Sequence, residues 1–190
     1  SIYNPTDNLI DLSEYYLSDA EDISENQHYY NLPTGNSFWS DALSGSDNDF
    51  IAKFPDESKI NPHETIIIAL DEQENFNSYY SDYYSDYKIF YMLAQGNLQT
   101  DMLNAVEDQI TIGGTPDFYD GWESLILFKW DGDSNSLVQD VDYFYWGNPA
   151  GLDFYGVDKT DISTYQDDTP FDIQKQHILE AHEDNEAYFR

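Results

Sequence analysis

Residues 121–147, GWESLILFKWDGDSNSLVQDVDYFYWG, are the stretch that decides the expected fold. Two apolar runs, at 125–130 and 137–146, flank the segment DGDSN at 131–135. Asp, Gly, Ser and Asn favour tight turns and positive φ, so the pattern predicts a β-hairpin.

The second arm of this hairpin is expected to have one buried face and one face that begins in water. Alternation assigns to the buried face the side chains of Leu137, Val141, Tyr143 and Tyr145. It places Asp140 and Asp142 on the wet face, before Phe144 and Trp146 take it over.

The charge of the chain argues against one class of partner. Seven basic residues against 38 acidic ones give a net charge of −31 and a pI near 4.1. Binding a phosphate backbone needs Lys and Arg to displace counterions, so we expect no nucleic-acid partner. A solvated acidic coat on a secreted or halotolerant protein is the favoured interpretation, ahead of a dedicated cation-binding surface.

The composition predicts a folded, mostly β protein. Aromatic residues make up 17% of the 190 residues, which argues against a disordered acidic chain. Turn signals recur at spacings of roughly 8 to 12 residues, as in sandwiches and barrels of short strands. Without Cys, disulfides and thiolate metal sites are excluded. No apolar run is long enough to span a membrane, and the chain is expected to be a processed product whose signal peptide is not included.

The expected organisation is a single domain over 1–190, with an insertion at 71–120 and a long loop or tail at 148–190. Extended segments are expected at residues 2–3, 15–18, 28–32, 49–54, 64–70, 88–93 and 109–112. The Ile-rich run at 64–70 is expected to be buried on both faces and to lie centrally in a sheet. Helical segments are expected at residues 72–79, 101–107 and 171 to about 181. The repeat YYSDYYSD at 79–86 fits a helix or a strand, and a loop is expected to follow Tyr79.

Short motifs recur along the chain in a recognisable order. They are Asn4-Pro5-Thr6, Ile10-Asp11-Leu12-Ser13, Tyr15-Tyr16-Leu17-Ser18-Asp19, Ile60-Asn61-Pro62-His63-Glu64, Val138-Gln139-Asp140-Val141-Asp142-Tyr143, Gly156-Val157-Asp158-Lys159-Thr160 and Ala187-Tyr188-Phe189-Arg190. Together they resemble bacterial lamin tail domains. His63 departs from the family pattern, which has Gly at this turn position, and Glu14 stands where the family usually has Gly. The resemblance implies an immunoglobulin-like, two-sheet β-sandwich that serves as an accessory domain of exported proteins, a fold that says little about chemistry.

The predicted hairpin turn contains candidate calcium ligands. The oxygens of Asp131, Asp133 and Asn135 alternate as in a calcium loop, and Asp142 falls at the twelfth position. Position six is Ser136, where such a loop needs Gly, and Asp142 lacks the reach of a bidentate Glu. An ordinary acidic turn is therefore the favoured interpretation, with calcium as an optional ligand and no cofactor required.

A second candidate is an aromatic platform for sugar rings or peptide. Its residues are Phe38, Trp39, Tyr79, Tyr80, Tyr83 and Tyr84. The alternative, which we favour from the sequence, is that these rings cover the edge and ends of the fold.

The functional hypothesis is a non-enzymatic, extracytoplasmic binding or surface-attachment module of an exported bacterial protein. Its partner is expected to be a protein or carbohydrate at the cell surface. The alternatives are a metal-dependent hydrolase with an acidic cleft built from loops, and a calcium-stabilised carbohydrate-binding domain. No nucleophile elbow, phosphate-binding Gly loop or Ser-His-Asp set is present in the sequence to favour an enzyme.

Overall fold

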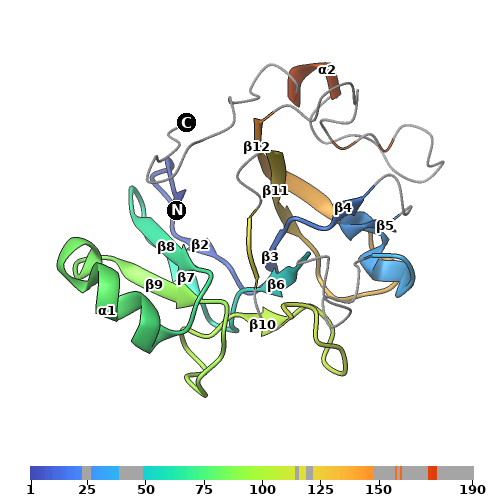
Figure 1. The fold of residues 1–190 in the computed structure, drawn as a ribbon. Helices are drawn as coiled ribbons and strands as arrows, with labels where there is room; N and C mark the ends of the chain where they lie inside the picture. The colour runs from blue at the N-terminus through green and yellow to red at the C-terminus, as the bar shows by residue number, and fades with distance from the viewer. Residues whose placement is uncertain are drawn as a thin grey trace. The chain divides into compact units, whose positions relative to one another are not determined.

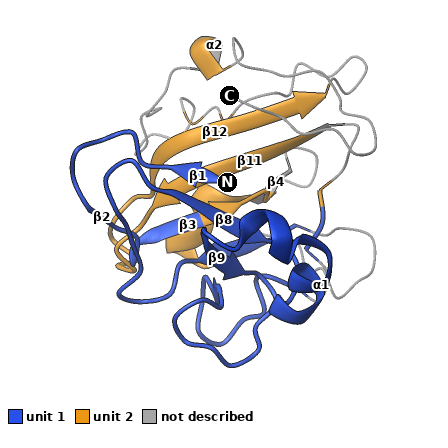
Figure 2. Ribbon diagram, turned by 90° about the vertical axis from the view of Figure 1, so that its left-hand side faces the viewer, with its two compact units in different colours: residues 1–16, 41–117 blue, residues 17–40, 118–190 orange. Residues whose placement is uncertain are grey.

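The structure is a computed structural model that describes residues 1–22, 27–38, 49–113, 116–118, 122–147, 157, 159 and 171–174. The described part of the chain is mostly β, as the sequence predicts, with short strands in several sheets (Figure 1). The predicted single domain contains two compact units: residues 1–16 with 41–117 form unit 1, and residues 17–40 with 118–190 form unit 2 (Figure 2). No helix of the described residues is long and apolar enough to cross a membrane.

Unit 1 contains most of the short strands and the longer helix. Its elements are β1 (Ile2–Tyr3), β2 (Ile10–Asp11), β6 (Ile51–Lys53), β7 (Lys59–Ile60), β8 (Thr65–Ala69), α1 (Gln73–Tyr84), β9 (Lys88–Tyr91) and β10 (Leu103–Asn104). The strand β3 (Tyr15–Ser18) begins in unit 1 and ends in unit 2. Antiparallel pairs join β2 to β7 and β10 to β6.

The Ile-rich strand β8 lies centrally in its sheet, as predicted, in the order β1-β8-β9. Ile66 and Ala69 are buried, whereas Ile67 and Ile68 are only half-buried. The pair β8–β9 is parallel and its strands are connected through α1, an arrangement that needs a helical crossover. The hypothesis of an immunoglobulin-like sandwich did not include this parallel pair. The ring of Phe54 packs edge-on against that of Phe90 in β9, with ring centroids 5.1 Å apart.

Unit 2 is dominated by the long hairpin. Its elements are β4 (Glu21–Asp22), β5 (Gln27–His28), the 3₁₀ helix η1 (Tyr29–Thr34), β11 (Trp122–Lys129), β12 (Gln139–Gly147) and the short helix α2 (Phe171–Gln174). The predicted hairpin is confirmed, because β11 and β12 pair antiparallel from Trp122 opposite Gly147 to Lys129 opposite Gln139.

A β-bulge in this hairpin corrects the predicted faces of β12. Leu127 lies opposite Asp142 and Phe128 opposite Asp140, so Val141 is the extra residue. The insertion shifts the alternation by one position and brings Asp140 onto the face that carries Tyr143. Asp140 is therefore buried, with 8% of its surface exposed, whereas Val141 is 45% exposed. Leu137, also predicted to be buried, is 47% exposed.

Three further sequence predictions are wrong in detail. Within the segment 28–32 only His28 is extended, because η1 begins at Tyr29 and ends at Thr34; Gly35 caps it with a φ of 71°, which suits a helix end. The segment 101–107 is not helical: Leu103 and Asn104 form β10, which pairs with β6. The segment 109–112 is not a strand, although Ile51 donates a backbone hydrogen bond to the carbonyl of Thr111.

The helix α1 is longer than predicted. It continues from Gln73 through the tyrosine repeat to Tyr84, where a loop was expected. Rings four residues apart lie on one stripe of a helix and support each other. In α1 the rings of Phe76 and Tyr80 are 5.1 Å apart, and those of Tyr80 and Tyr84 are 6.3 Å apart. These contacts give the repeat a physical reason to be helical. The predicted C-terminal helix is present as α2 over 171–174, and its remainder lies outside the described residues.

Candidate functional site

The helix α1 has an inner aromatic stripe that holds it against unit 1. Phe76, Tyr80 and Tyr84 form this stripe, and the ring of Phe76 contacts that of Tyr91 in β9 at 6.1 Å, nearly edge-on. Tyr91 is itself buried, and its burial raises the pKa of its hydroxyl. Phe76 therefore packs α1 against β9, whereas Tyr80 is 48% exposed and contacts its neighbours along the helix.

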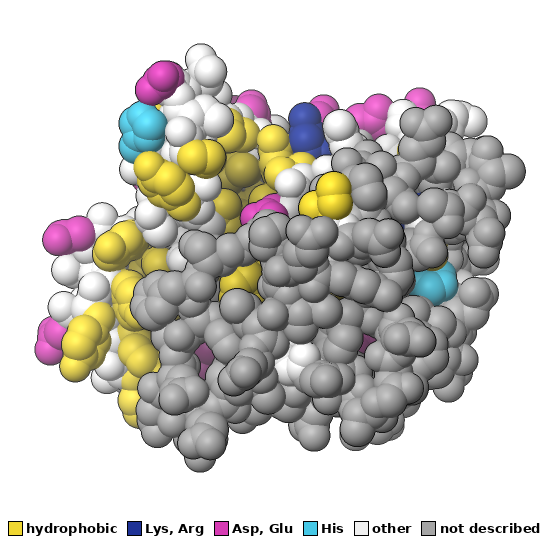
Figure 3. Space-filling view, turned by 90° about the horizontal axis from the view of Figure 1, so that it is seen from above, with side chains coloured by type: hydrophobic (Ala, Val, Ile, Leu, Met, Phe, Trp, Pro, Cys, Tyr) yellow, Lys and Arg dark blue, Asp and Glu magenta, His cyan; other side chains and the backbone are white. Residues whose placement is uncertain are grey.

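The outer stripe of α1 is directed to solvent. Tyr79 is 77% exposed and Tyr83 is 76% exposed, the largest exposures of any tyrosine in the described residues. Four residues apart, they lie one turn from each other on the same side of the helix. Seen from above, several hydrophobic side chains, a class that here includes Tyr, are exposed among the described residues (Figure 3). We call Tyr79 and Tyr83 the tyrosine face.

Polar groups surround the tyrosine face. The residues of α1 include Asn75, Ser78 and Asp82, and none of its twelve residues is basic. Amide, hydroxyl and carboxylate groups donate and accept hydrogen bonds next to the rings. The helix therefore combines exposed aromatic surface with a negative, hydrogen-bonding neighbourhood.

The two remaining residues of the predicted platform belong to unit 2. Phe38 is buried, with 3% of its surface exposed, so it has little surface to offer a ligand. Trp39 lies outside the described residues. The four tyrosines of the predicted platform all lie on α1, and the two most exposed of them form the tyrosine face.

The predicted calcium ligands lie in the turn of the hairpin and on β12. The carboxylate of Asp131 accepts hydrogen bonds from the backbone of Asp133, at 2.9 Å, and from the hydroxyl of Ser136, at 2.8 Å. One oxygen of Asp133 accepts two bonds from Asn135, both at 2.8 Å. Asp142 accepts a bond from the backbone of Tyr143.

The turn oxygens are thus engaged by the turn itself. Among the described residues no three acidic, histidine or cysteine side chains gather in a way that would hold a metal ion. The bonds from Asn135 also lower the pKa of Asp133 below the ordinary value for an aspartate, because they stabilise its charged form. This network is that of an acidic turn, the interpretation favoured from the sequence.

A buried polar cluster in unit 2 was not predicted. The side chains of Lys159 and Asp140 are both 0% exposed, and their ammonium nitrogen and carboxylate oxygen Oδ2 are 2.5 Å apart. The hydroxyl of Tyr29 donates to Asp140 Oδ1 at 2.6 Å, and the hydroxyl of Tyr143 donates to Oδ2. We call these four residues the Asp140 cluster.

The only sequence signal for this cluster was the small number of basic residues in the chain. Lys159 is one of seven basic residues in the chain, and it lies in one of the motifs that carry the family resemblance. Alternation along β12 pointed the wrong way, because the bulge at Val141 reverses the face of Asp140.

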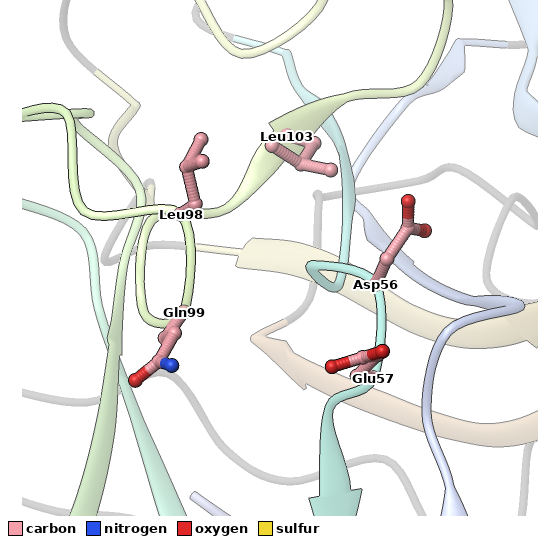
Figure 4. Close-up of a pocket in the computed structure, with 5 residues that line it drawn as sticks. All are labelled: Asp56, Glu57, Leu98, Gln99 and Leu103. Atoms are coloured by element: carbon pink, nitrogen blue, oxygen red, sulfur yellow. The ribbon is translucent and has the colours of Figure 1, made fainter.

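A small pocket lies in unit 1, with a volume of about 350 Å³. It is lined by Asp56, Glu57, Leu98, Gln99 and Leu103. Figure 4 shows Leu98 and Gln99 on one side of it and Asp56 and Glu57 on the other. Asp56 forms an exposed ion pair with Lys53 at 3.1 Å, and no histidine or hydroxyl side chain lines the pocket to serve as base or nucleophile. We assign no chemistry to it.

Comparisons with models of protein families, with curated proteins and with solved structures gave no match for this chain.

Proposed function

We propose that the chain is a non-enzymatic binding or surface-attachment module, similar to a lamin tail domain, of an exported bacterial protein. It acts outside the cytoplasm or at the cell surface, and its tyrosine face binds neutral carbohydrate there. The observation that carries this proposal is the exposure of Tyr79 and Tyr83, at 77% and 76%, on one side of a helix that is anchored by its opposite stripe.

Carbohydrate fits this face for two physical reasons. The C–H face of a sugar ring packs on an aromatic ring, whereas its hydroxyls need partners of the kind that Tyr, Asn, Ser and Asp supply. A protein partner is the alternative, because exposed tyrosines are also enriched among the residues that dominate protein–protein binding.

The charge of the chain limits which class of carbohydrate can bind. A net charge of −31 repels polysaccharides that carry carboxylate or sulfate groups, and α1 has no basic residue to counter them. A neutral sugar polymer is therefore the preferred ligand class. The same charge supports a location outside the cytoplasm, since a dense acidic coat keeps a protein soluble at high salt.

The family-like part of the proposal is supported by how two of the motifs interact. Asn4, which is 2% exposed, donates its side-chain amide to the carbonyls of Asn8 and Asn61, and its carbonyl accepts a backbone bond from His63. The carboxylate of Glu64 closes its own turn by accepting the backbone N–H of Asn61 at 2.6 Å. The first and fourth motifs thus form one hydrogen-bonded corner.

The position of His63 adds to this support. His63 stands where the family pattern has Gly, and its φ is 58°, in the left-handed region that glycine adopts readily. The turn therefore has the backbone conformation that explains a glycine in the pattern. His63 tolerates it with side-chain hydrogen bonds to Tyr3, at 3.2 Å, and to Asp7, at 3.0 Å.

The test is pull-down of the full chain by insoluble neutral polysaccharides such as cellulose and chitin, followed by titration with their soluble oligosaccharides. We expect binding by the wild type and loss of at least tenfold in affinity for the double variant Tyr79→Ala and Tyr83→Ala. Leu98→Ala is the matched control, because Leu98 is 81% exposed in the same unit but lies outside α1.

Binding that survives the double variant would contradict the assignment of the tyrosine face. Retention by a polyanionic resin in preference to neutral sugars would contradict the electrostatic argument. The metal-dependent hydrolase gains no support from the described residues, in which no metal-binding group of side chains is present.

A further inference from the structure

The Asp140 cluster places an amine and a carboxyl group in reacting position inside unit 2. Lys159 Nζ lies 2.5 Å from Asp140 Oδ2, and the two residues are 19 positions apart in the sequence. Both side chains are 0% exposed. Bulk water is therefore excluded from both groups.

The surroundings of the pair are aromatic and apolar. Tyr29, which is 0% exposed, packs against Phe128 with ring centroids 4.9 Å apart, and Phe128 lies opposite Asp140 in the strand ladder. On the other side Tyr143 stacks on Tyr145. Val157, two residues before Lys159, is fully buried. A charge-separated pair in such an environment loses most of its solvation, which its mutual attraction only partly offsets.

We propose that Lys159 and Asp140 form an intramolecular isopeptide bond, an amide between Nζ and Cγ. A proton passes from Nζ to Oδ2, which leaves a neutral amine beside a neutral carboxylic acid. The amine nitrogen attacks Cγ. The N–Cγ bond forms, the Cγ–Oδ2 bond breaks, and Oδ2 leaves as water with a second proton from Nζ. Atoms and charge balance, because the ammonium and the carboxylate together give a neutral amide and one water molecule.

The two tyrosines are catalytic residues in this reaction, since both touch the reacting carboxyl group. The hydroxyl of Tyr29 donates to Oδ1, the oxygen that gains negative charge when the amine attacks and that remains as the amide oxygen. The hydroxyl of Tyr143 donates to Oδ2, the leaving oxygen. Each carboxyl oxygen therefore has its own donor.

The reaction also removes a cost that the ion pair imposes. Two buried charges pay a desolvation penalty that their attraction only partly repays. The amide carries no charge, and its oxygen retains the hydrogen bond from Tyr29. The water produced leaves a site in which both side chains are 0% exposed, so bulk water has little access to hydrolyse the amide.

The primary test is intact-mass spectrometry of the purified, fully denatured chain. We expect a mass lower than that of the sequence by one water molecule, with proteolysis giving a branched peptide that joins the segments around 140 and 159. A full sequence mass after prolonged incubation of the folded protein would overturn the proposal.

A loss of water located elsewhere would overturn it as well. Asp-Gly sequences lose water by forming a succinimide, and the chain has two, at 120–121 and 131–132. Peptide mapping separates the two reactions, because a succinimide leaves the segments around 140 and 159 unlinked. Lys159→Met must abolish the branched peptide, whereas Lys53→Met must leave it unchanged. Lys53 is the matched control because its pair with Asp56 is exposed to water.

Two further variants test the chemistry rather than the fold. Asp140→Asn is expected to form the same bond with loss of ammonia in place of water, a change in mass that a structural role cannot produce. Tyr29→Phe is expected to slow formation of the bond at least tenfold after refolding, with the refolded state checked by circular dichroism. Equal rates in a folded Tyr29→Phe variant would remove Tyr29 from the mechanism, and loss of water in Asp140→Ala would overturn the bond itself.

Discussion

Replacing Lys159 by Met tests how much of the stability of unit 2 depends on the Asp140 cluster. Met nearly preserves the length of the side chain but leaves the carboxylate of Asp140, which is 0% exposed, without its cation. Breaking a buried ion pair by removing one partner costs about 3 to 5 kcal/mol. That is a large part of the total, because small proteins unfold with about 5 to 15 kcal/mol.

The isopeptide bond between Lys159 and Asp140, once formed, increases the difference in the free energy of unfolding between the wild type and Lys159→Met. Closing a loop with a cross-link restricts the unfolded chain, by about 3 kcal/mol for a loop close in length to the 19-residue separation of Asp140 and Lys159. We therefore expect Lys159→Met to lower the free energy of unfolding by about 3 to 5 kcal/mol relative to the wild type that is not cross-linked, and by more relative to the cross-linked form.

The assay is urea denaturation followed by two signals. All four tryptophans lie within the residue ranges of unit 2, so their fluorescence reports the unit that contains the cluster. Far-UV circular dichroism reports both units and also measures the control, Lys53→Met. Lys53 pairs with Asp56 at the surface, and an exposed pair contributes about 0 to 1 kcal/mol.

A second variant distinguishes the cost of the unpaired charge from the cost of lost packing. Replacing both partners, Asp140→Leu with Lys159→Met, leaves no buried charge, and we expect it to recover most of the stability lost in Lys159→Met. The reasoning is refuted when Lys159→Met destabilises the protein no more than Lys53→Met does, or when the double variant is less stable than the single one.

Three further predictions follow from the described turns. His63→Gly should be more stable than His63→Ala by about 1 kcal/mol in thermal or urea unfolding, because the left-handed backbone at this position penalises a Cβ atom; an equal or reversed order would show that the turn relaxes. The carboxyl of Asp133 should titrate below the ordinary range of an aspartate by NMR, and its contribution to stability should be present above that range and disappear as the pH falls through its lowered pKa; Asn135→Ala should move the midpoint only part of the way back, because the backbone N–H of residue 135 still donates to the carboxylate. Calcium and a chelator should give coincident thermal melts, since the oxygens of Asp131 already accept bonds from the turn; a higher midpoint with calcium would show that an ion binds the native state.

Local residue patterns predicted the elements whose structure is determined by residues close together in the sequence. The turn residues at 131–135 predicted the hairpin, and the strand pairing of β11 and β12 confirms it. The Ile-rich run predicted the central position of β8. The tyrosine repeat left helix and strand undecided, and the helix is favoured by ring contacts between Phe76, Tyr80 and Tyr84, together with the packing of Phe76 on Tyr91.

Elements that are stabilised by residues far away in the sequence could not be predicted from local patterns. β10 is a strand because Leu103 and Asn104 pair with Lys53 and Ala52 of β6, roughly fifty positions earlier. The Asp140 cluster likewise depends on residues from three separate parts of the chain, and no spacing rule connects them. Its strongest determinant, the bulge at Val141, leaves no signature in the alternation of apolar and polar residues.

Because of the bulge at Val141, the residues that β12 buries depend on the register of the strand as well as on residue identity. Deleting Val141 would remove the bulge, restore strict alternation and keep Asp140 on the face that carries Tyr143, because Asp140 would then lie two positions before Tyr143 and still opposite Phe128. A relative of this protein can therefore lack the residue at 141 and still bury the acid, with no substitution at all. Alignments of such relatives should be anchored on Tyr143 and allowed a one-residue gap before it.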